Sequence, residues 1–269
     1  MVPPRTESGR RERQSEAAND ATAKLIVPTH NLVLAALPHR EANALVSLAK
    51  PLFMEAGDVV YEDRDKINHV YFPINSVFSS LAILEDGSSV EVSMTGREGI
   101  AGLAAIIGGG RALHWTRVSV PGAALRLRAE SVREFFLKSE AIHEAVLRAY
   151  RGLFTQICQR SVCNVRHSLL QRLCVWLLMI HDRVAANELP FTQEEIASRI
   201  SVRRAGVSVA ASMLQAMHAI SYRRGRIVIT DRHAIEQTAC ECYPVLNQDF
   251  LDAEGRHISR FPVSPDLKE

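Results

Sequence analysis

The sequence predicts an α+β chain in which an N-terminal antiparallel β-roll, a long helix and a C-terminal helical domain with a β-hairpin follow one another. Three observations predict it: short apolar runs separated by turn residues over 59–127, an apolar heptad pattern over 146–157, and a capped helix at Thr192 that precedes an Arg/Gly-rich hairpin. A length of 269 residues suits two modest domains.

Composition sets the class and the compartment. A hydrophobic content of 47% with 23% charged residues is ordinary for a protein with a full core. The five cysteines are an odd number scattered along the chain, which favours a reduced, cytoplasmic setting over a disulfide framework. The first 27 residues are polar and lack a signal-peptide core, and no apolar run is long enough to cross a membrane. We therefore expect a cytoplasmic protein that does not associate with a membrane.

Five segments are expected along the chain. They are a disordered arm (1–27), a β-roll domain (28–130), a central helix (131–165), a helical domain with a β-hairpin (166–245) and a tail (246–269). Within the roll, short helical turns are expected over 31–50, closed by Pro51. Strands are then expected at 59–61, 69–72, 77–84, 90–94, 115–120 and 124–127. Asp86-Gly87 marks the clearest hairpin turn.

The central helix carries an apolar seam. Its members, Val146, Tyr150, Leu153 and Ile157, repeat at intervals of four, three and four residues. We expect this seam to pair two copies of the chain, with packing against its own domain as the alternative. Asn164 is expected to cap the next helix, which has a wide apolar stripe that includes Trp176.

The stretch 191–230 predicts a helix-turn-helix. Thr192 and Glu195 form a capping-box pattern that begins a helix, and 201–203 supply a short turn before a second helix over 204–218. The inward positions are small or apolar: Ile196, Ala197, Ile200, Val207, Ala210, Ala211 and Leu214. Two short strands follow, joined by a tip that contains Arg223, Arg224, Gly225 and Arg226, which together predict a basic wing.

Charge supports a nucleic-acid partner for this region. Eleven arginines stand against five acidic residues over 160–232, whereas the rest of the chain carries a net negative charge. A basic wing beside a basic second helix is the pattern expected of a surface that contacts DNA phosphates.

At this point the sequence resembles a known family. Residues 191–197 and 225–228 resemble the winged-helix domain of the Crp/Fnr superfamily of transcription regulators, and residues 57–61 and 96–99 resemble its cyclic-nucleotide-binding-like β-roll. The likeness covers about 32–243. It implies a homodimer joined through the long central helix, with two recognition helices in successive major grooves about 34 Å apart.

The resemblance also implies residue roles. Thr192 matches a phosphate-contacting position, Arg204 a basic residue that reaches a base edge or phosphate, and Ser208 a small polar residue near the groove. Ala205 and Val209 replace the usual Glu and second Arg, and Ser201 replaces the usual turn glycine. Arg203 and Arg204 would then make most polar contacts, with Ala205 and Val209 against thymine methyl groups, so we expect an operator unlike that of the better-known members.

The family's nucleotide pocket is not matched. It uses Gly-Glu-x-Gly for the ribose and Arg-Ser/Thr-Ala for the cyclic phosphate. The corresponding positions here contain Gly99, Ile100 and Gly102, then Ala112 and Leu113, with Arg111 one position away. We expect no cyclic nucleotide. We also expect no iron–sulfur cluster of the kind that the resemblance implies for oxygen-responsive members, because those have an N-terminal cysteine cluster and no cysteine precedes Cys158 here. We expect no metal, and Cys240 and Cys242 are interpreted as incidental thiols.

Two other classes of function compete with a DNA-binding regulator. A ligand-sensing module whose C-terminal domain docks a protein partner would need neither Arg203-Arg204 nor the basic wing. An enzyme would need a nucleophile–base set or a metal cluster, and no such spacing is found, so no catalytic residue is assigned. The expected partners are double-stranded DNA, a second copy of the chain and RNA polymerase.

Overall fold

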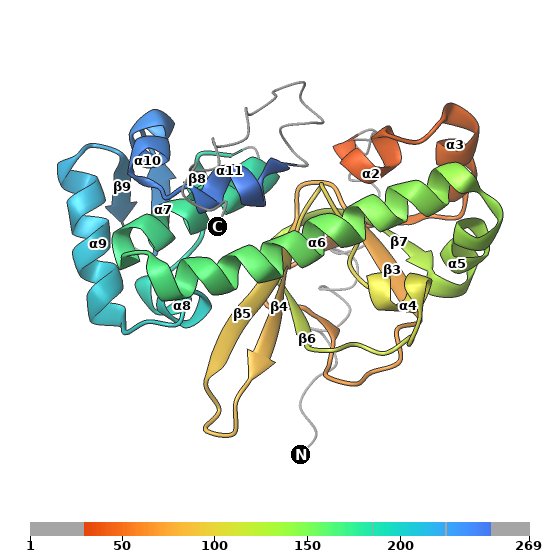
Figure 1. Cartoon of the computed structure of the whole chain (residues 1–269), viewed down its shortest axis with the longest axis horizontal. Helices are drawn as coiled ribbons and strands as arrows, with labels where there is room; N and C mark the ends of the chain where they lie inside the picture. The colour runs from red at the N-terminus through yellow and green to blue at the C-terminus, as the bar shows by residue number, and fades with distance from the viewer. Residues whose placement is uncertain (1–29, 185, 224, 249–269) are drawn as a thin grey trace, which may run out of the picture.

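The structure is a computed structural model that describes residues 30–184, 186–223 and 225–248. The predicted arm (1–27) and most of the predicted tail (246–269) lie outside these residues. Figure 1 shows a long helix, α6, that runs between a β-rich N-terminal domain and a mainly helical C-terminal domain. Among the described helices, none has both the length and the apolar character needed to cross a membrane.

The N-terminal domain is an antiparallel roll with short helices at its edges. Its strands are β1 (Lys50–Met54), β2 (Val59–Tyr61), β3 (His69–Pro73), β4 (Val77–Ile83), β5 (Ser89–Thr95), β6 (Trp115–Val120) and β7 (Gly122–Arg128). They form one sheet of order β1-β7-β3 and another of order β2-β6-β4-β5. The helices are α2 (Leu32–Ala35), α3 (His39–Ser47), α4 (Leu103–Ile107) and α5 (Ala129–Lys138).

All six predicted strands are present, and the turn at Asp86-Gly87 joins β4 to β5. Gly87 has a φ of 81°, a conformation that glycine adopts at little cost. Two elements were missed in this domain. Strand β1 contains Pro51, which the sequence favoured as a terminator, and α4 is too short to show a helical period.

The predicted central helix (131–165) is two helices. α5 ends at Lys138, and Ser139 then caps α6 (Glu140–Arg166) by accepting a hydrogen bond from the Ile142 amide. The prediction that Asn164 caps the following helix is wrong, because Asn164 lies inside α6. The next helix, α7 (Leu169–Val184), begins after Ser168, whose hydroxyl accepts from the Gln171 amide while the Gln171 side chain accepts from the Ser168 amide.

The C-terminal domain has the predicted winged arrangement. It contains α8 (Gln193–Arg199), α9 (Arg204–Ala216), β9 (Ile220–Arg223), β10 (Arg226–Ile229), α10 (Arg232–Thr238) and α11 (Cys242–Leu246). A third strand, β8 (Glu188–Leu189), pairs with β10 and was too short to predict. The core centres on α7, whose Trp176 is 2% exposed and meets Phe191 edge to face at 4.9 Å.

Candidate nucleic-acid interface and ligand cavity

The capping box that begins α8 is present as predicted. The Thr192 hydroxyl accepts from the Glu195 amide at 3.2 Å, and the Glu195 carboxylate accepts from the Thr192 amide at 2.7 Å. Ile196 and Ala197 are buried in the core cluster to which α7 and α9 also contribute. Because the cap fixes the start of α8, it also fixes how the chain enters the helix-turn-helix.

The turn between α8 and α9 is tight although it lacks glycine. Ser201 has a φ of 53°, in the left-handed region that costs a non-glycine residue about 1 kcal/mol. The Val202 amide donates to the Ala197 carbonyl at 3.0 Å and closes the turn. Helix α9 then buries the predicted positions Val207, Ala210, Ala211 and Leu214. It ends at Ala216, two residues earlier than predicted.

The outer face of α9 is exposed. Arg203, at the N-cap, and Arg204, in the first turn, are exposed, and neither forms an ion pair with another described residue. Val209 is 63% exposed and Ala205 is exposed, whereas Ser208 is half-buried. Two unpaired cations therefore stand at the start of an exposed helix face that also presents small apolar side chains.

The wing is a two-residue hairpin beside the start of α8. Arg223 lies opposite Arg226 in the ladder, and Gly225 in the turn has a φ of 77°. A Cβ on Gly225 would lie 3.2 Å from the Thr192 side chain, so the wing tip approaches the capping box. Arg223 is exposed, and Arg226 pairs with Glu188 while its side chain stays 68% exposed. Arg224 lies outside the described residues.

A buried carboxylate joins this domain to the roll. Glu91 on β5 has a fully buried side chain that accepts from Arg160 on α6 at 2.9 Å, Trp176 on α7 at 3.0 Å and Arg199 on α8 at 3.1 Å. Burial raises the pKa of Glu91, but Arg160 and Arg199 outweigh burial, so the pKa lies below its ordinary value. Glu91 is therefore an anion that ties β5 to three helices. No sequence pattern marked it.

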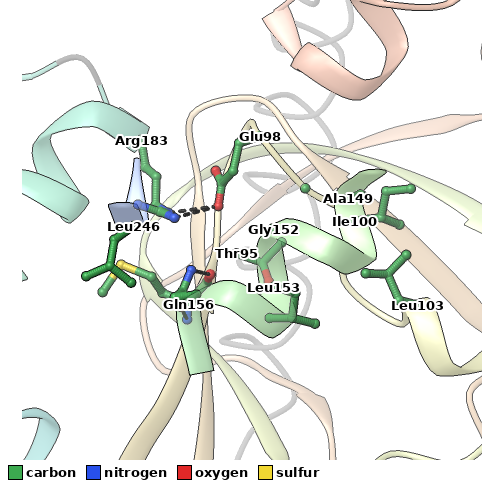
Figure 2. Close-up of a pocket in the computed structure, with 12 residues that line it drawn as sticks. Thr95, Glu98, Ile100, Leu103, Ala149, Gly152, Leu153, Gln156, Arg183 and Leu246 are labelled. Carbon is green, nitrogen blue, oxygen red and sulfur yellow. Dashed lines mark hydrogen bonds and ion pairs between the residues drawn. The ribbon is translucent and has the colours of Figure 1, made fainter. Parts of the chain in front are cut away.

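A second ion pair between the domains lies at the small pocket of Figure 2. Arg183 on α7 is 1% exposed and donates to Glu98 at 2.9 Å through Nε. A Cβ on Gly96 would lie 2.7 Å from the Arg183 Cγ, so only glycine fits there. The pocket itself is about 30 Å³, which leaves space for water and not for a larger ligand. The segment from Gly96 to Gly99 thus holds α7 against the roll.

The larger cavity lies between the roll and α6. Its volume is about 420 Å³, in the range of small-molecule sites. Four of the five predicted pocket residues line it, namely Ile100, Gly102, Ala112 and Leu113. Gly99 lines the small pocket instead. Among the described lining residues none is acidic, and Arg111 at the rim donates to the Arg64 carbonyl at 2.9 Å.

Tyr61 supplies a polar group at this cavity. Its hydroxyl donates to the His69 carbonyl at 2.7 Å. Burial, with a smaller effect of Tyr71, raises the pKa of Tyr61 well above its ordinary value, so the phenol is neutral. A Cβ on Gly102 would lie 2.6 Å from that hydroxyl, which explains a glycine at this position.

Of the predicted dimer seam, three members line this cavity, and one of them, Tyr150, is also 41% exposed. Leu153 and Ile157 line the cavity together with Tyr150. Val146 is 2% exposed in the core of its own domain, so its assignment to the seam is wrong. An apolar heptad pattern does not distinguish packing against the same chain from packing against a partner, and here the alternative weighed from sequence holds for Val146.

The exposed apolar face of α6 lies about a quarter turn away, at 100° per residue. It comprises Leu147, Tyr150, Phe154, Val162 and Val165, each at least 41% exposed. Tyr150 stands at the boundary of the two faces, and its ring stacks on Phe154 with centroids 6.3 Å apart. The sequence pattern did not reveal this face, because polar residues interrupt it.

Comparison with known proteins assigns both domains. Residues 51–139 match the family model of a cyclic nucleotide-binding domain, and residues 171–238 match that of a Crp-like helix-turn-helix domain. No curated protein matches the sequence.

Solved structures share the fold at low sequence identity. FixK2 from Bradyrhizobium japonicum has a TM-score of 0.62 at 14% identity, covering 71% of this chain and 98% of its own. A putative Crp/Fnr-family regulator from Eubacterium rectale has a TM-score of 0.60 at 14% identity, covering 78% and 98%. A CRP-family regulator from Thermus thermophilus has a TM-score of 0.59 at 17% identity, covering 70% and 95%. The arrangement of roll, long helix and helix-turn-helix is thus a shared architecture.

Proposed function

The chain belongs to the Crp/Fnr superfamily of transcription regulators, and from this premise we propose that it binds a two-fold-symmetric DNA operator as a cytoplasmic homodimer. We further propose that its roll responds to a ligand other than a cyclic nucleotide. The observation that carries the proposal is the pair of exposed, unpaired arginines, Arg203 and Arg204, at the start of α9.

Base recognition follows from the chemistry of α9. An arginine at the start of a recognition helix can donate two parallel hydrogen bonds to guanine, which discriminates by about 1–3 kcal/mol. Val209 and Ala205 offer apolar contact to thymine methyl groups, and both are exposed. Because neither donates hydrogen bonds, the operator differs from one read by Glu and Arg at these positions.

Phosphate contacts come from the flanks of α9. The Thr192 hydroxyl lies at the start of α8, and the wing turn at Gly225 approaches its side chain, with Arg223 and Arg226 opposite each other on the adjoining strands. Arg224 is assigned the same role from its place in the sequence. Phosphate contacts fix the register of the protein on DNA and make the affinity depend on salt.

Dimerisation is assigned to the exposed face of α6. Phe154, Val162 and Val165 are 56%, 50% and 82% exposed, which is costly for a helix that stays unpaired. A second copy is the occupant that the family architecture implies, since a two-fold axis along α6 presents two α9 helices together. RNA polymerase is a further proposed partner, recruited once the dimer is on DNA.

The effector is assigned to the cavity of about 420 Å³. A cyclic nucleotide needs a carboxylate for its 2′-hydroxyl and a cation with a hydroxyl for its phosphate. Ile100 and Ala112 occupy positions where those groups are expected. The lining is mostly apolar but includes the hydroxyl residues Ser93, Thr95 and Thr116, so the cavity is suited to a mainly apolar molecule with one or two polar groups.

The test is DNA binding measured by fluorescence anisotropy. Bound sites are first selected from random duplex DNA, and the dissociation constant is then measured over a range of salt. We expect log K to fall linearly with log salt, and Arg204→Ala to weaken binding to the selected site by about ten- to a hundredfold. Arg40→Ala, on the exposed surface of the roll, is the control that leaves binding unchanged.

The second candidate is a module whose C-terminal domain docks a protein. Binding to DNA without salt dependence, together with an unchanged affinity in Arg204→Ala, would favour it and overturn the proposal. The exposure of Arg203 and Arg204 without acidic partners among the described residues favours DNA.

A further inference from the structure

Three cysteines and a histidine meet at the end of α6. Cys163 lies in the last turn of α6 and His167 is the C-cap of that helix, whereas Cys240 lies between α10 and α11 and Cys242 is the first residue of α11. Their ligand atoms all lie within 4.8 Å of one another. The two pairs are more than seventy residues apart in the sequence, and α11 packs across α6 to bring them together (Figure 1).

The separations match one tetrahedral ion. The sulfurs of Cys163 and Cys240 are 3.6 Å apart, and the sulfur of Cys242 lies 3.4 Å from Nδ1 of His167. Zinc with Zn–S bonds of about 2.3 Å and a Zn–N bond of about 2.0 Å sets these ligand atoms about 3.8 Å and about 3.6 Å apart in a tetrahedron. Both separations thus lie within about 0.2 Å of the tetrahedral values, and all four ligand atoms lie within 4.8 Å of one another.

Residues outside the four ligands are arranged to support such an ion. Glu241 contacts Nε2 of His167 at 3.1 Å, which leaves Nδ1 to face the cysteines. A carboxylate on the second ring nitrogen is the usual partner of a metal-binding histidine. Gln159 donates to the sulfur of Cys242 at 3.1 Å, and such a bond stabilises a thiolate. These contacts fix the orientation of ligands from both segments.

The donor set selects the ion. Three sulfurs and one imidazole nitrogen favour zinc among the common metals, and a closed set of four protein ligands is typical of a structural site. An iron–sulfur cluster places inorganic sulfide between its cysteines and spreads them further apart than a single ion does. Cys163 is 4% exposed and the His167 side chain 12% exposed, so water has little access.

We propose that Cys163, His167, Cys240 and Cys242 bind one Zn²⁺ ion that clamps the α10–α11 segment to the end of α6. This site replaces the expectation that Cys240 and Cys242 are incidental thiols. The junction of α6 with α7 lies directly after His167, so the ion holds the C-terminal domain where it joins the long helix. The site is independent of the ligand cavity and of the DNA surface.

The first test is the metal content of the full chain, purified from cells grown with zinc and without a metal-affinity step. Elemental analysis is expected to give one zinc per chain, and X-ray absorption three sulfurs at about 2.3 Å and one nitrogen at about 2.0 Å. Cys240→Ser is expected to lose the zinc. Cys158→Ser is the matched control, because Cys158 is an exposed thiol on the same helix outside the cluster.

A second variant keeps the proposal falsifiable if Cys240→Ser fails to fold. The Glu241 side chain is 62% exposed, so Glu241→Gln is expected to keep the fold, checked by circular dichroism. Competition with a chromogenic chelator is expected to show a 10- to 100-fold weaker zinc affinity than in the wild-type chain. DNA binding, measured alongside, reports separately on the proposed function.

Several outcomes would overturn the proposal. They are a wild-type chain without zinc after growth in zinc, an unchanged zinc content in Cys240→Ser, an unchanged affinity in folded Glu241→Gln, and iron with inorganic sulfide in place of zinc. A Cys163–Cys240 disulfide in protein purified under reducing conditions, detected as a loss of two hydrogens by mass spectrometry, would also overturn it.

Discussion

The carboxylate of Glu91 and the guanidinium of Arg199, 108 residues apart in the sequence, form an ion pair of 3.1 Å that joins the β4–β5 hairpin to the first helix of the helix-turn-helix. The next residue on the same strand, Val92, lines the ligand cavity. A displacement of β5 by a ligand would therefore act on α8 through Glu91, whose side chain is fully buried and whose ion pairs are therefore sensitive to distance.

Replacing Glu91 tests this ion-pair network. Glu91→Gln leaves Arg160 and Arg199 buried without an anion, and breaking such a pair costs about 3–5 kcal/mol. We expect a loss of this size in the free energy of unfolding, measured by urea denaturation. Glu134→Gln is the control: its pair with Lys138 is mostly exposed and is expected to contribute less than about 0.5 kcal/mol. Equal losses in the two variants would contradict the structure.

The same carboxylate predicts an acid dependence. The pKa of Glu91 in the folded chain lies below its ordinary value of 4.5, so its contribution to stability is complete above that value and lost as the pH falls through the folded-state pKa. The stability difference between wild type and Glu91→Gln should therefore be constant near neutral pH and shrink below about pH 4. A difference that stays constant down to the lowest pH at which both fold would refute this.

The structure shows why patterns found some of these features and missed others. The capping box at Thr192 and the turn at Asp86-Gly87 were predicted because each depends on residues within four positions of one another. Glu91 was missed because its partners come from α6, α7 and α8, and nothing local marks a carboxylate that will be buried. The cluster of Cys163, His167, Cys240 and Cys242 was missed for the same reason, because its two halves meet only when α11 packs on α6.

The exposed face of α6 gives a prediction about the oligomer. Phe154 is 56% exposed at the middle of that face, and Phe154→Arg would place a charge in the proposed dimer interface. We expect the variant to be monomeric by analytical ultracentrifugation and to bind a symmetric operator at least about tenfold more weakly. Leu137→Arg, at a 67% exposed position on α5, should remain dimeric. A dimeric Phe154→Arg would place the interface elsewhere.

The wing and α9 should differ in how they affect binding. Arg223 lies on the wing, where it is assigned to a phosphate contact. Arg223→Ala should therefore weaken binding to all DNA sequences alike. It should also reduce the slope of log K against log salt by about 0.9 for each phosphate that the variant leaves unneutralised. Arg204→Ala should instead relax the preference at one base pair of the selected site. Binding to the selected operator and to a scrambled duplex over the same salt range separates the two effects. Loss of base preference in Arg223→Ala would contradict the assignment.

The lining of the ligand cavity predicts indifference to cyclic nucleotides. Ile100 offers no carboxylate for a ribose, so saturating cyclic AMP should leave the melting temperature and the DNA affinity unchanged, where a true ligand would add about 2 kcal/mol or more. An apolar fluorescent probe should bind instead. Leu153 lines the cavity from the α6 side, so Leu153→Trp places an indole ring inside it. The cavity of about 420 Å³ has little room for both the indole and the probe, and we expect the variant to exclude the probe. Stabilisation by cyclic AMP would assign the cavity to cyclic nucleotides. Probe binding that is unaffected in Leu153→Trp would place the probe outside the cavity.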